Sequence, residues 1–376
     1  MTSRLDLAWE QLHAASHYSL RRSGRYLIAE LQGTHLVLST SARNGGQVRG
    51  VRFLANHQSC EATNHTARQS AIKALGQEGY HDSVCGEMGF PAGEVALMGT
   101  AANMNYAAIV TREDRGLEVT AVVTGGVQGN AACAGDPAGW REGDQGWEKV
   151  DGTINMMLLV NHPLTEAAIA RSVVTMTEAK TTALQRLSVR SLYSSDPATG
   201  TGTDQFAIAA PENGKHQLTS ASPHVKLGEL IGCAVRDATL EALRWQNGLE
   251  PSYTRSIFTA LGRFGLREET FFNDIAPMLS EHDLDLMRRN GKSVFYEPLV
   301  AAATYAFAAV LDRIRYETLP ASASREALRQ QAALVAINLS AKPDLWAQFR
   351  AQLTDDDSTR LLLRALAIGW SAKWHS

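Results

Sequence analysis

Short runs of apolar and β-branched residues dominate the first half of the chain and predict strands. Arg25–Leu31 and His35–Thr40 are two such runs separated by Gly33, and we expect them to form a hairpin. A second hairpin is predicted from Tyr106–Thr111 and Leu117–Thr124, which are joined by a short charged segment. Further strands are expected at Gln47–Phe53, Thr153–Val160 and Gln205–Ala210.

Apolar residues at helical spacing predict two long helices in the middle of the chain. They cover Leu164–Leu187 and Val225–Trp245. Cys60–Leu75 also has a helical pattern. The glycine-rich stretches Tyr80–Gly93 and Val127–Trp147 are expected to be loops.

The pattern changes after Gly248, where β-prone runs disappear and helical patterns continue to the end of the chain. We therefore predict a boundary near Gly248–Pro251 and two domains, residues 1–248 and 249–376. The length of 376 residues fits one large domain and a smaller one. The expected fold is α+β, with a mixed or antiparallel sheet packed against the two long helices and an all-helical C-terminal extension.

Composition and charge exclude several classes of protein. The chain is 44% hydrophobic and 20% charged with a net charge of -3, as in ordinary globular proteins, and it has no basic patch for nucleic acid. The N-terminus lacks the apolar core of a signal peptide. The longest apolar run, Leu299–Leu311, is too short to span a bilayer. We expect a cytoplasmic protein without a membrane span, which could form a homo-oligomer.

The segment from Ala198 to Asp204 alternates threonine and glycine and is the first candidate for chemistry. Such a loop offers hydroxyl and backbone N–H groups in a compact turn, which suits an anion or an oxyanion. Asp204 could orient a catalytic group or a water. The alternative is a tight turn before a strand. The candidate residues of this loop are Thr199, Gly200, Thr201, Thr203 and Asp204.

The segment Thr177–Lys180 is the second candidate. Lys180 lies on the apolar stripe of its predicted helix, one turn after Met176, whereas Glu178 lies about 200° away around the helix axis. Only one of these two side chains can therefore face a given cleft. Alternatively, they are an ordinary surface glutamate and a lysine at the helix edge. His224, just before the next helix, is either a general acid–base group or a helix cap.

A metal site is a further possibility. His57 and Cys60, and His81 and Cys85, have spacings that zinc ligands can have. They match no standard zinc motif, and no complete ligand set is apparent. The GxSxG, HExxH and Walker patterns of common hydrolases and nucleotide-binding proteins are also absent. We therefore expect a reaction that needs no metal.

Three groups of segments, over roughly residues 25–245, resemble the adenosylcobinamide amidohydrolases, the CbiZ family. The first group comprises Leu97–Asn105, Leu117–Gly126 and Asn130–Asp136. The second comprises Gly152–Asn155, Pro163–Ala168 and Thr177–Leu184, and the third comprises Ala198–Asp204 and His224–Ile231. The order and spacing of the segments carry the resemblance.

The resemblance implies an amidohydrolase of corrinoid salvage. Members of this family hydrolyse the amide between a propionate side chain of the corrin and aminopropanol, which gives adenosylcobyric acid. The corrinoid is then the substrate, and no cofactor is expected. In this setting we expect Glu178 to be the base, Lys180 to have a structural or electrostatic role, and Asp204 and His224 to approach the same cleft.

Glycine and asparagine residues of these segments are the candidates for substrate binding. Glycine allows the backbone to approach a large flat corrin closely, and asparagine can bond its peripheral amides. The alternative is that the glycines only form turns. Besides the threonine loop, the candidates are Asn44, Gly45, Gly46, Asn103, Asn105, Gly125, Gly126, Asn130 and Asn155.

Two alternatives remain open from the sequence. The amide could belong to a different corrinoid or to another tetrapyrrole. The chain could also be a corrinoid-binding protein without hydrolytic activity, whose helical extension contacts a partner.

Overall fold

A computed structural model describes residues 5–61, 66–138, 153–214 and 216–374 of the chain. The chain divides into two compact units, Met1–Leu249 and Glu250–Ser376. The first unit contains sheets and helices, and the elements described in the second are helical. The predicted α+β class with a helical C-terminal region is therefore confirmed.

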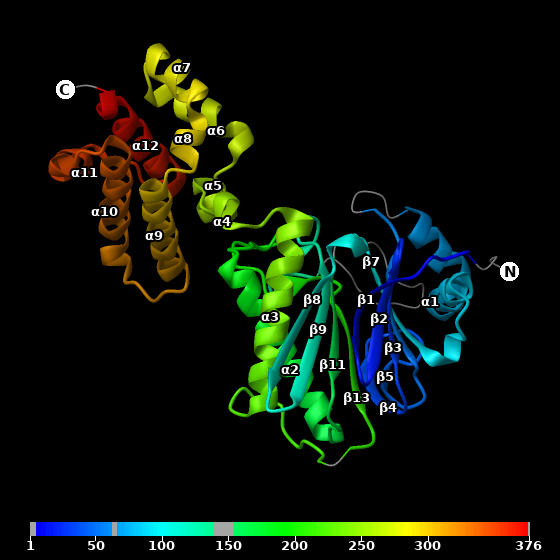
Figure 1. Cartoon of the computed structure of the whole chain (residues 1–376). Helices are drawn as coiled ribbons and strands as arrows, with labels where there is room; N and C mark the ends of the chain where they lie inside the picture. Colours follow the sequence, from blue (N-terminus) through cyan, green and yellow to red (C-terminus); the bar gives the residue numbers. More distant parts are fainter. Residues whose placement is uncertain (1–4, 62–65, 139–152, 215, 375–376) are drawn as a thin grey trace. The chain divides into compact units, whose positions relative to one another are not determined.

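Two large sheets form the centre of the first unit (Figure 1). The five-stranded sheet has the order β1 (Glu10–Ala15), β2 (Tyr18–Ser23), β3 (Tyr26–Leu31), β6 (Phe53–Gln58) and β7 (Val95–Thr100). The six-stranded sheet has the order β5 (Gly46–Val48), β4 (His35–Ser39), β13 (Gln205–Pro211), β11 (Ile154–Val160), β9 (Leu117–Gly125) and β8 (Ala108–Asp114). Both sheets are mixed, because β6 pairs with β7 and β11 pairs with β13 in parallel.

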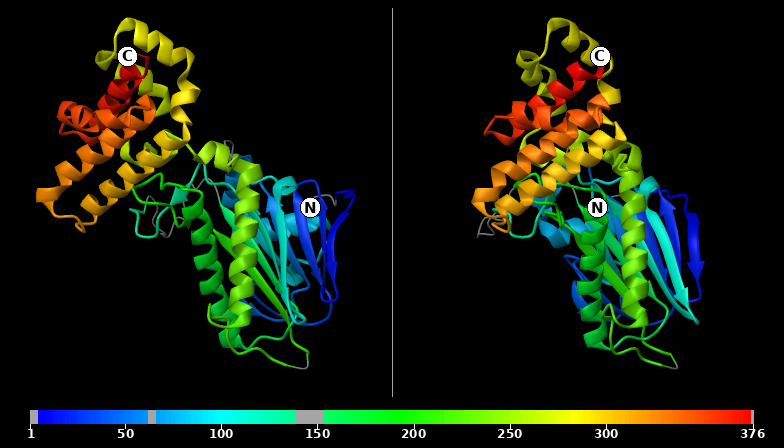
Figure 2. Two further views of the ribbon diagram at one scale, coloured as in Figure 1. Left: turned by 60° about the vertical axis from the view of Figure 1, so that its left-hand side comes forward. Right: turned by 90° about the vertical axis from the view of Figure 1, so that its left-hand side faces the viewer.

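The two sheets pack face to face, and helices cover their outer faces (Figure 2). Leu54 and Met98 of one sheet share a buried apolar cluster with Val122 and Met157 of the other. Helix α1 (Thr66–Met88) packs on the outer face of the five-stranded sheet. Helices α2 (Glu166–Arg186) and α3 (Lys226–Asn247) cover the six-stranded sheet.

Helices α2 and α3 confirm the two long helices that the apolar periodicity predicts. Thr165 caps α2 by accepting a hydrogen bond from the N–H of Ala168, and Glu166 lies favourably in the first turn. Gly248 ends α3 in the left-handed conformation, at φ 65°. The hairpin of β8 and β9 is confirmed as well.

The hairpin predicted from Arg25–Leu31 and His35–Thr40 is wrong. These runs become β3 and β4, which belong to different sheets. Gly33, at φ 82°, lies in the connection where the chain passes from one sheet to the other. β3 forms a hairpin with the preceding β2, and β4 pairs with the following β5, so each run has its local partner on the side away from Gly33. The strand predicted at Gln47–Phe53 is displaced, since β5 ends at Val48 and β6 begins at Phe53.

The loop predicted at Tyr80–Gly93 is also wrong for most of its length, because α1 continues to Met88. Its buried residues His81, Val84, Cys85 and Met88 recur at helical spacing, but Gly86 between them and the glycines on either side obscure the pattern. Residues 62–65 of the helix predicted at Cys60–Leu75, and residues 139–147 of the loop predicted at Val127–Trp147, lie outside the described residues.

The second unit has its own apolar core. Buried residues of this cluster include Phe271, Phe307, Leu362 and Trp370, and all members come from the second unit. Its helices are α4 (Pro251–Thr254), α5 (Ile257–Leu261), α6 (Glu268–Ile275), α7 (Glu281–Arg289), α8 (Gly291–Phe295), α9 (Pro298–Arg315), α10 (Ala321–Ser340), α11 (Trp346–Gln352) and α12 (Ser358–Trp374). No helix in the described ranges is long and apolar enough to cross a membrane.

We predict that a chain ending at Leu249 folds without the helical unit. The clusters between the sheets and beneath α1, α2 and α3 contain residues of the first unit only. The shortened chain should therefore unfold cooperatively, with a Tm close to that of the first unit in the full chain, as measured by circular dichroism. Residues 250–376, expressed alone, are the matched control. Insolubility of the shortened chain, with the full chain soluble, would contradict the prediction.

We also predict that the chain loses stability below pH 6.5. His17 and His57 are buried, and their ring nitrogens have no hydrogen-bond partner among the described residues. Burial lowers the pKa of His17 from 6.5 to about 4 and that of His57 to about 3. Between these values and pH 6.5, only the unfolded imidazoles take up protons, so acid favours unfolding.

Each histidine should lower the free energy of unfolding by about 2 kcal/mol between pH 6.5 and pH 5. Urea unfolding at pH 7 and pH 5 measures the difference. His17→Gln should reduce this difference in the free energy of unfolding, whereas His224→Gln, at an exposed position, should leave the difference unchanged. Equal stability of the unmodified chain at both pH values would show that these imidazoles are not kept neutral.

Candidate functional site

Three loops meet at one end of the six-stranded sheet. Parallel pairing aligns the starts of β11 and β13, so that Ile154 lies beside the segment before Gln205. On the other side of β11, Ile154 pairs with Gly125 at the end of β9. The residues that follow β9, together with Thr153 before β11 and Thr199–Asp204 before β13, are therefore brought to one edge, and they contain much of the predicted site.

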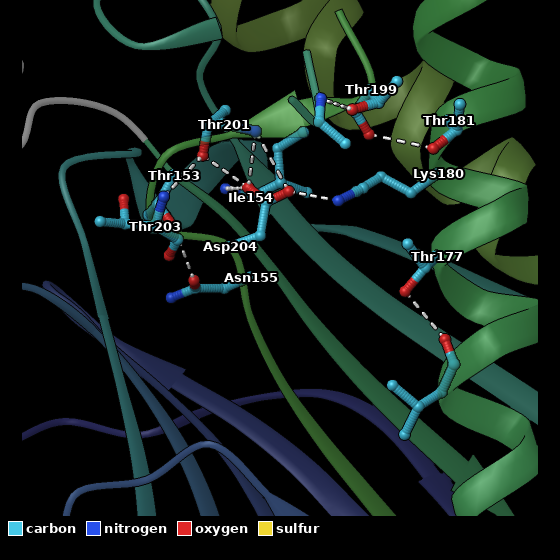
Figure 3. Close-up of polar contacts among 12 residues, drawn as sticks. Thr153, Ile154, Asn155, Thr177, Lys180, Thr181, Thr199, Thr201, Thr203 and Asp204 are labelled. Carbon is cyan, nitrogen blue, oxygen red and sulfur yellow. Dashed lines mark hydrogen bonds and ion pairs between the residues drawn. The ribbon is translucent and has the colours of Figure 1, made fainter. Parts of the chain in front are cut away.

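The carboxylate of Asp204 joins its own loop to the start of β11 and to α2 (Figure 3). Its Oδ1 accepts hydrogen bonds from the N–H of Ile154 at 3.0 Å and from Oγ1 of Thr201 at 2.5 Å. Its Oδ2 forms an ion pair with Nζ of Lys180, which reaches it from α2. The structure thus brings together three residues that the sequence predicts as candidates.

The pair of Lys180 and Asp204 is largely withdrawn from water. Their side chains are 7% and 15% exposed. Removing one partner of such a pair would leave an uncompensated charge, which typically costs roughly 3–5 kcal/mol. The pair therefore fixes the end of α2 against the threonine loop whatever else it does.

Gly200 is required beside this pair. A Cβ atom at this position would lie 2.4 Å from Oδ2 of Asp204 and 2.7 Å from Nζ of Lys180. Gly202 is similarly close to Asn130, since a Cβ there would lie 2.8 Å from the amide nitrogen. The alternation of threonine and glycine in the sequence thus reflects two close approaches of side chains to the loop.

The threonine loop does not offer a row of free backbone donors. The N–H groups of Thr199 and Gly202 donate to backbone carbonyls, and that of Thr201 donates to Asp204. Oγ1 of Thr199 accepts from the N–H of Ala134 at 2.8 Å. The expectation that these N–H groups stabilise an oxyanion is therefore corrected for Thr199, Thr201 and Gly202, because the turn uses them to hold its own shape.

Glu178 does not take part in this arrangement. It is exposed on α2, whereas Lys180 on the same helix is buried and bound to Asp204. The predicted separation around the helix is correct, but the choice of Glu178 as the residue that faces the loop is wrong. Lys180 fits the inner face because its ammonium group finds a carboxylate there.

The prediction that His224 approaches the same cleft is also wrong. It is exposed and precedes the first turn of α3. The end of the sheet that contains Asp204 lies beside Leu243 of α3, because a Cβ atom at Gly125 would lie 3.4 Å from the Leu243 side chain. From Lys226 to Leu243 the helix rises about 26 Å. His224 therefore lies far from Asp204.

Asn44, Gly45 and Gly46 form the turn that leads into β5, and Asn44 also contacts the edge of the five-stranded sheet. The amide of Asn44 donates to the carbonyls of Ala92 at 3.0 Å and Val95 at 2.8 Å. A Cβ atom at Gly45 would lie 2.1 Å from a backbone oxygen, and Gly46 has φ 73°. Asn44 thus holds the start of β7, whereas Gly46 pairs with Ser39 in the six-stranded sheet.

The residues after β7 and β9 contact the end of α3. The N–H of Asn103 donates to Oε1 of Gln246 at 3.0 Å, and Oδ1 of Asn103 accepts from the N–H of Asn105 at 2.9 Å. Gly126 packs against the same glutamine, and Gly125 lies in close contact with Ile154. Asn103 and Asn105 thus lie in one turn, which includes the short helix η2 (Met104–Tyr106).

Asn130 is buried beneath the threonine loop. Its carbonyl accepts from the N–H of Gly202 at 3.2 Å, and its Oδ1 accepts from the hydroxyl of Tyr193 at 2.7 Å. The neighbouring strands β10 (Ala131–Ala132) and β12 (Gly200–Thr201) form a small ladder. Tyr193 was not predicted, although an aromatic residue within a Ser-rich turn was a visible signal.

A second set of polar side chains lies between the two sheets and was also missed, apart from Asn155. Asn56 donates to Oγ1 of Thr124 at 2.7 Å and accepts from Nδ2 of Asn155 at 2.9 Å. The hydroxyl of Thr153 contacts Oδ1 of Asn155 and donates to the carbonyl of Thr203 at 2.5 Å. This inter-sheet network connects the five-stranded sheet to the threonine loop. A polar residue inside the apolar run of β6 was the available signal.

The histidine and cysteine residues with zinc-like spacing do not form a metal site in the described part of the chain. No group of three or more His, Cys, Asp or Glu residues there could hold a metal ion. His57 stacks on Tyr26 with ring centroids 4.8 Å apart, and Nε2 of His81 lies 3.2 Å from the carbonyl of Ala92. Cys85 is buried in an apolar cluster, where burial raises the pKa of its thiol to about 12.

Comparisons with known proteins agree with the resemblance seen in the sequence. The family described as adenosylcobinamide amidohydrolase (CbiZ) matches residues 11–251. An uncharacterized protein of Methanocaldococcus jannaschii is 33% identical over 236 residues, which are 60% of this chain and 88% of that protein. A solved structure from Pyrococcus horikoshii is 12% identical, covers 63% of this chain and 83% of its own, and has a TM-score of 0.29, too low to carry an argument.

We predict that Gly200→Ala destabilises the first unit. The added methyl group would push Lys180 and Asp204 apart, and we expect a loss of about 3 kcal/mol in the free energy of unfolding, measured with urea. Gly232→Ala is the matched control, because a Cβ atom there meets nothing within 4 Å and alanine favours the helix. Equal effects of the two substitutions would show that the close approach at Gly200 is not required.

Proposed function

Because the chain belongs to the adenosylcobinamide amidohydrolase family, we propose that it hydrolyses the amide between aminopropanol and a propionate side chain of adenosylcobinamide. The products are adenosylcobyric acid and aminopropanol. The family match over residues 11–251 is the observation that carries this proposal. The family is one of hydrolases, and the largely buried charge pair beside a partly exposed hydroxyl group is compatible with amide hydrolysis.

Amide hydrolysis needs a nucleophile, a group that removes its proton, and donors for the developing negative charge. Thr201 is partly exposed, and its hydroxyl donates to Asp204 at 2.5 Å. We assign Thr201 as the nucleophile and Asp204 as the base, in place of Glu178. In this mechanism Thr201 attacks the amide carbon, Asp204 takes its proton and passes it to the leaving amine, and water then hydrolyses the ester.

Lys180 has two roles in this mechanism. Its ammonium group keeps the Asp204 carboxylate in position through their ion pair. An ammonium group carries three donors, so that one contact to Asp204 leaves others for the oxygen that gains negative charge. This electrostatic role is the one that the sequence resemblance suggested for Lys180, with the base moved from Glu178 to Asp204.

The reaction itself is tested with the purified full chain and adenosylcobinamide. Aminopropanol and adenosylcobyric acid, identified by mass spectrometry, should appear in equal amounts and in proportion to the enzyme. A corrinoid with a different amide side chain, supplied in parallel, distinguishes this substrate from a related one. If the protein binds adenosylcobinamide but releases no amine, it is a corrinoid-binding protein and the proposal is wrong.

We predict that Thr201→Val lowers kcat at least about a hundredfold, because it removes the hydroxyl and keeps the shape of the side chain. Thr201→Ser should retain activity, since it keeps the hydroxyl. Asp204→Asn should have an effect as large as that of Thr201→Val. Steady-state rates of amine release measure all three variants.

Two control substitutions lie on α2. Thr177→Val removes a hydroxyl that bonds to the carbonyl of Val173, and Glu178→Gln removes the charge of an exposed residue. Both should retain nearly full activity. A large loss of kcat in Glu178→Gln at unchanged Tm would return the base to Glu178, and an active Thr201→Val would exclude the covalent mechanism.

A further inference from the structure

The ring of Tyr193 is exposed beside the threonine loop although its hydroxyl group is fixed. The residue is 51% exposed, whereas the partner of its hydroxyl, Asn130, is 3% exposed. Oδ1 of Asn130 accepts from the Tyr193 hydroxyl at 2.7 Å, and the other side of Asn130 lies against Gly202. One side chain therefore separates the tyrosine hydroxyl from the loop that contains Thr201.

The turn that carries Tyr193 is held by several hydrogen bonds. Oγ of Ser191 accepts from the N–H groups of Tyr193 at 2.9 Å and Ser194 at 3.3 Å, and it donates to Asp136 at 2.5 Å. The N–H of Leu192 donates to the carbonyl of Ala131 at 2.9 Å, in the segment paired with the threonine loop. The backbone and the hydroxyl of Tyr193 are thus both anchored to the same loop region.

An exposed aromatic ring with both ends fixed is suited to bind a flat ligand. Exposure of a large apolar ring is unfavourable in water, and stacking with another flat group recovers this energy. A ring that is already fixed loses little conformational entropy when a ligand packs on it. A surface tyrosine without a ligand would need neither the bond to a buried asparagine nor the fixed turn.

We propose that Tyr193 is a substrate-binding residue whose exposed ring packs against a flat face of the corrinoid, with Asn130 holding it beside Thr201. This inference rests on the proposed function. The flat face belongs either to the corrin macrocycle or to the adenine of the adenosyl group, and both present the same chemistry to the ring. Asn130 acts through Tyr193 and Gly202, as a positioning residue.

The test compares Tyr193→Ala with Tyr193→Phe in the full chain. Loss of stacking in Tyr193→Ala should raise KM for adenosylcobinamide about three- to tenfold with kcat nearly unchanged. Tyr193→Phe keeps the ring and should raise KM less. Tyr316→Ala, an exposed tyrosine of the helical unit, is the control and should leave KM unchanged. Equal effects of the alanine and phenylalanine variants, or no change of KM in Tyr193→Ala, would overturn the proposal.

Direct binding separates this inference from the proposed reaction. Corrinoid binding is titrated by equilibrium dialysis with adenosylcobinamide and with cobinamide that lacks the adenosyl group. A loss of affinity of the same size for both ligands in Tyr193→Ala assigns the ring to the macrocycle, and a loss confined to the adenosyl form assigns it to adenine. If the unmodified chain binds but does not hydrolyse, only the proposed function fails. If it binds neither corrinoid, both fail.

Discussion

The carboxylate of Asp204 is the interaction on which the site depends. It joins a helix through Lys180, the first residue of a central strand through the N–H of Ile154, and its own loop through Thr201. A largely buried carboxylate requires such partners because an unpaired charge away from water is very unfavourable. The position of the loop, the end of α2 and the start of β11 are therefore set by the same group. Only glycine at position 200 leaves room for it.

The inter-sheet network extends this arrangement into the core. Asn56 belongs to the five-stranded sheet, and Asn155 belongs to the six-stranded sheet, yet their side chains bond directly. Thr153 continues the connection to the backbone of Thr203. Buried polar groups of this kind specify how two layers are aligned, because a displaced layer would leave them unpaired. The threonine loop is consequently positioned from both sides, by a charge pair on the helix face and by amides on the inner face.

The sequence predicted the long helices better than the pairing of strands and the contacts between side chains. Apolar periodicity located α2 and α3 and placed Lys180 on the apolar stripe, about 200° from Glu178. It did not identify the partner of Lys180, because Asp204 lies 24 residues away. The turn residue Gly33 suggested one hairpin of β3 and β4, whereas each of these strands pairs with its other neighbour in sequence, β2 and β5. His224 resembled a site residue by its place in a family-like segment, although α3 carries it far from Asp204.

The place of β13 in its sheet has a consequence for how the chain is made. It is the last strand of the sheet in sequence, yet it lies between β4 and β11. On the ribosome, both of these neighbours have to wait with unpaired backbone groups until Gln205–Pro211 has emerged. Pairing between segments so distant is slow, and exposed strand edges promote aggregation. The nascent chain thus keeps these strand edges open until Asp204, the residue that fixes its site, has emerged together with β13.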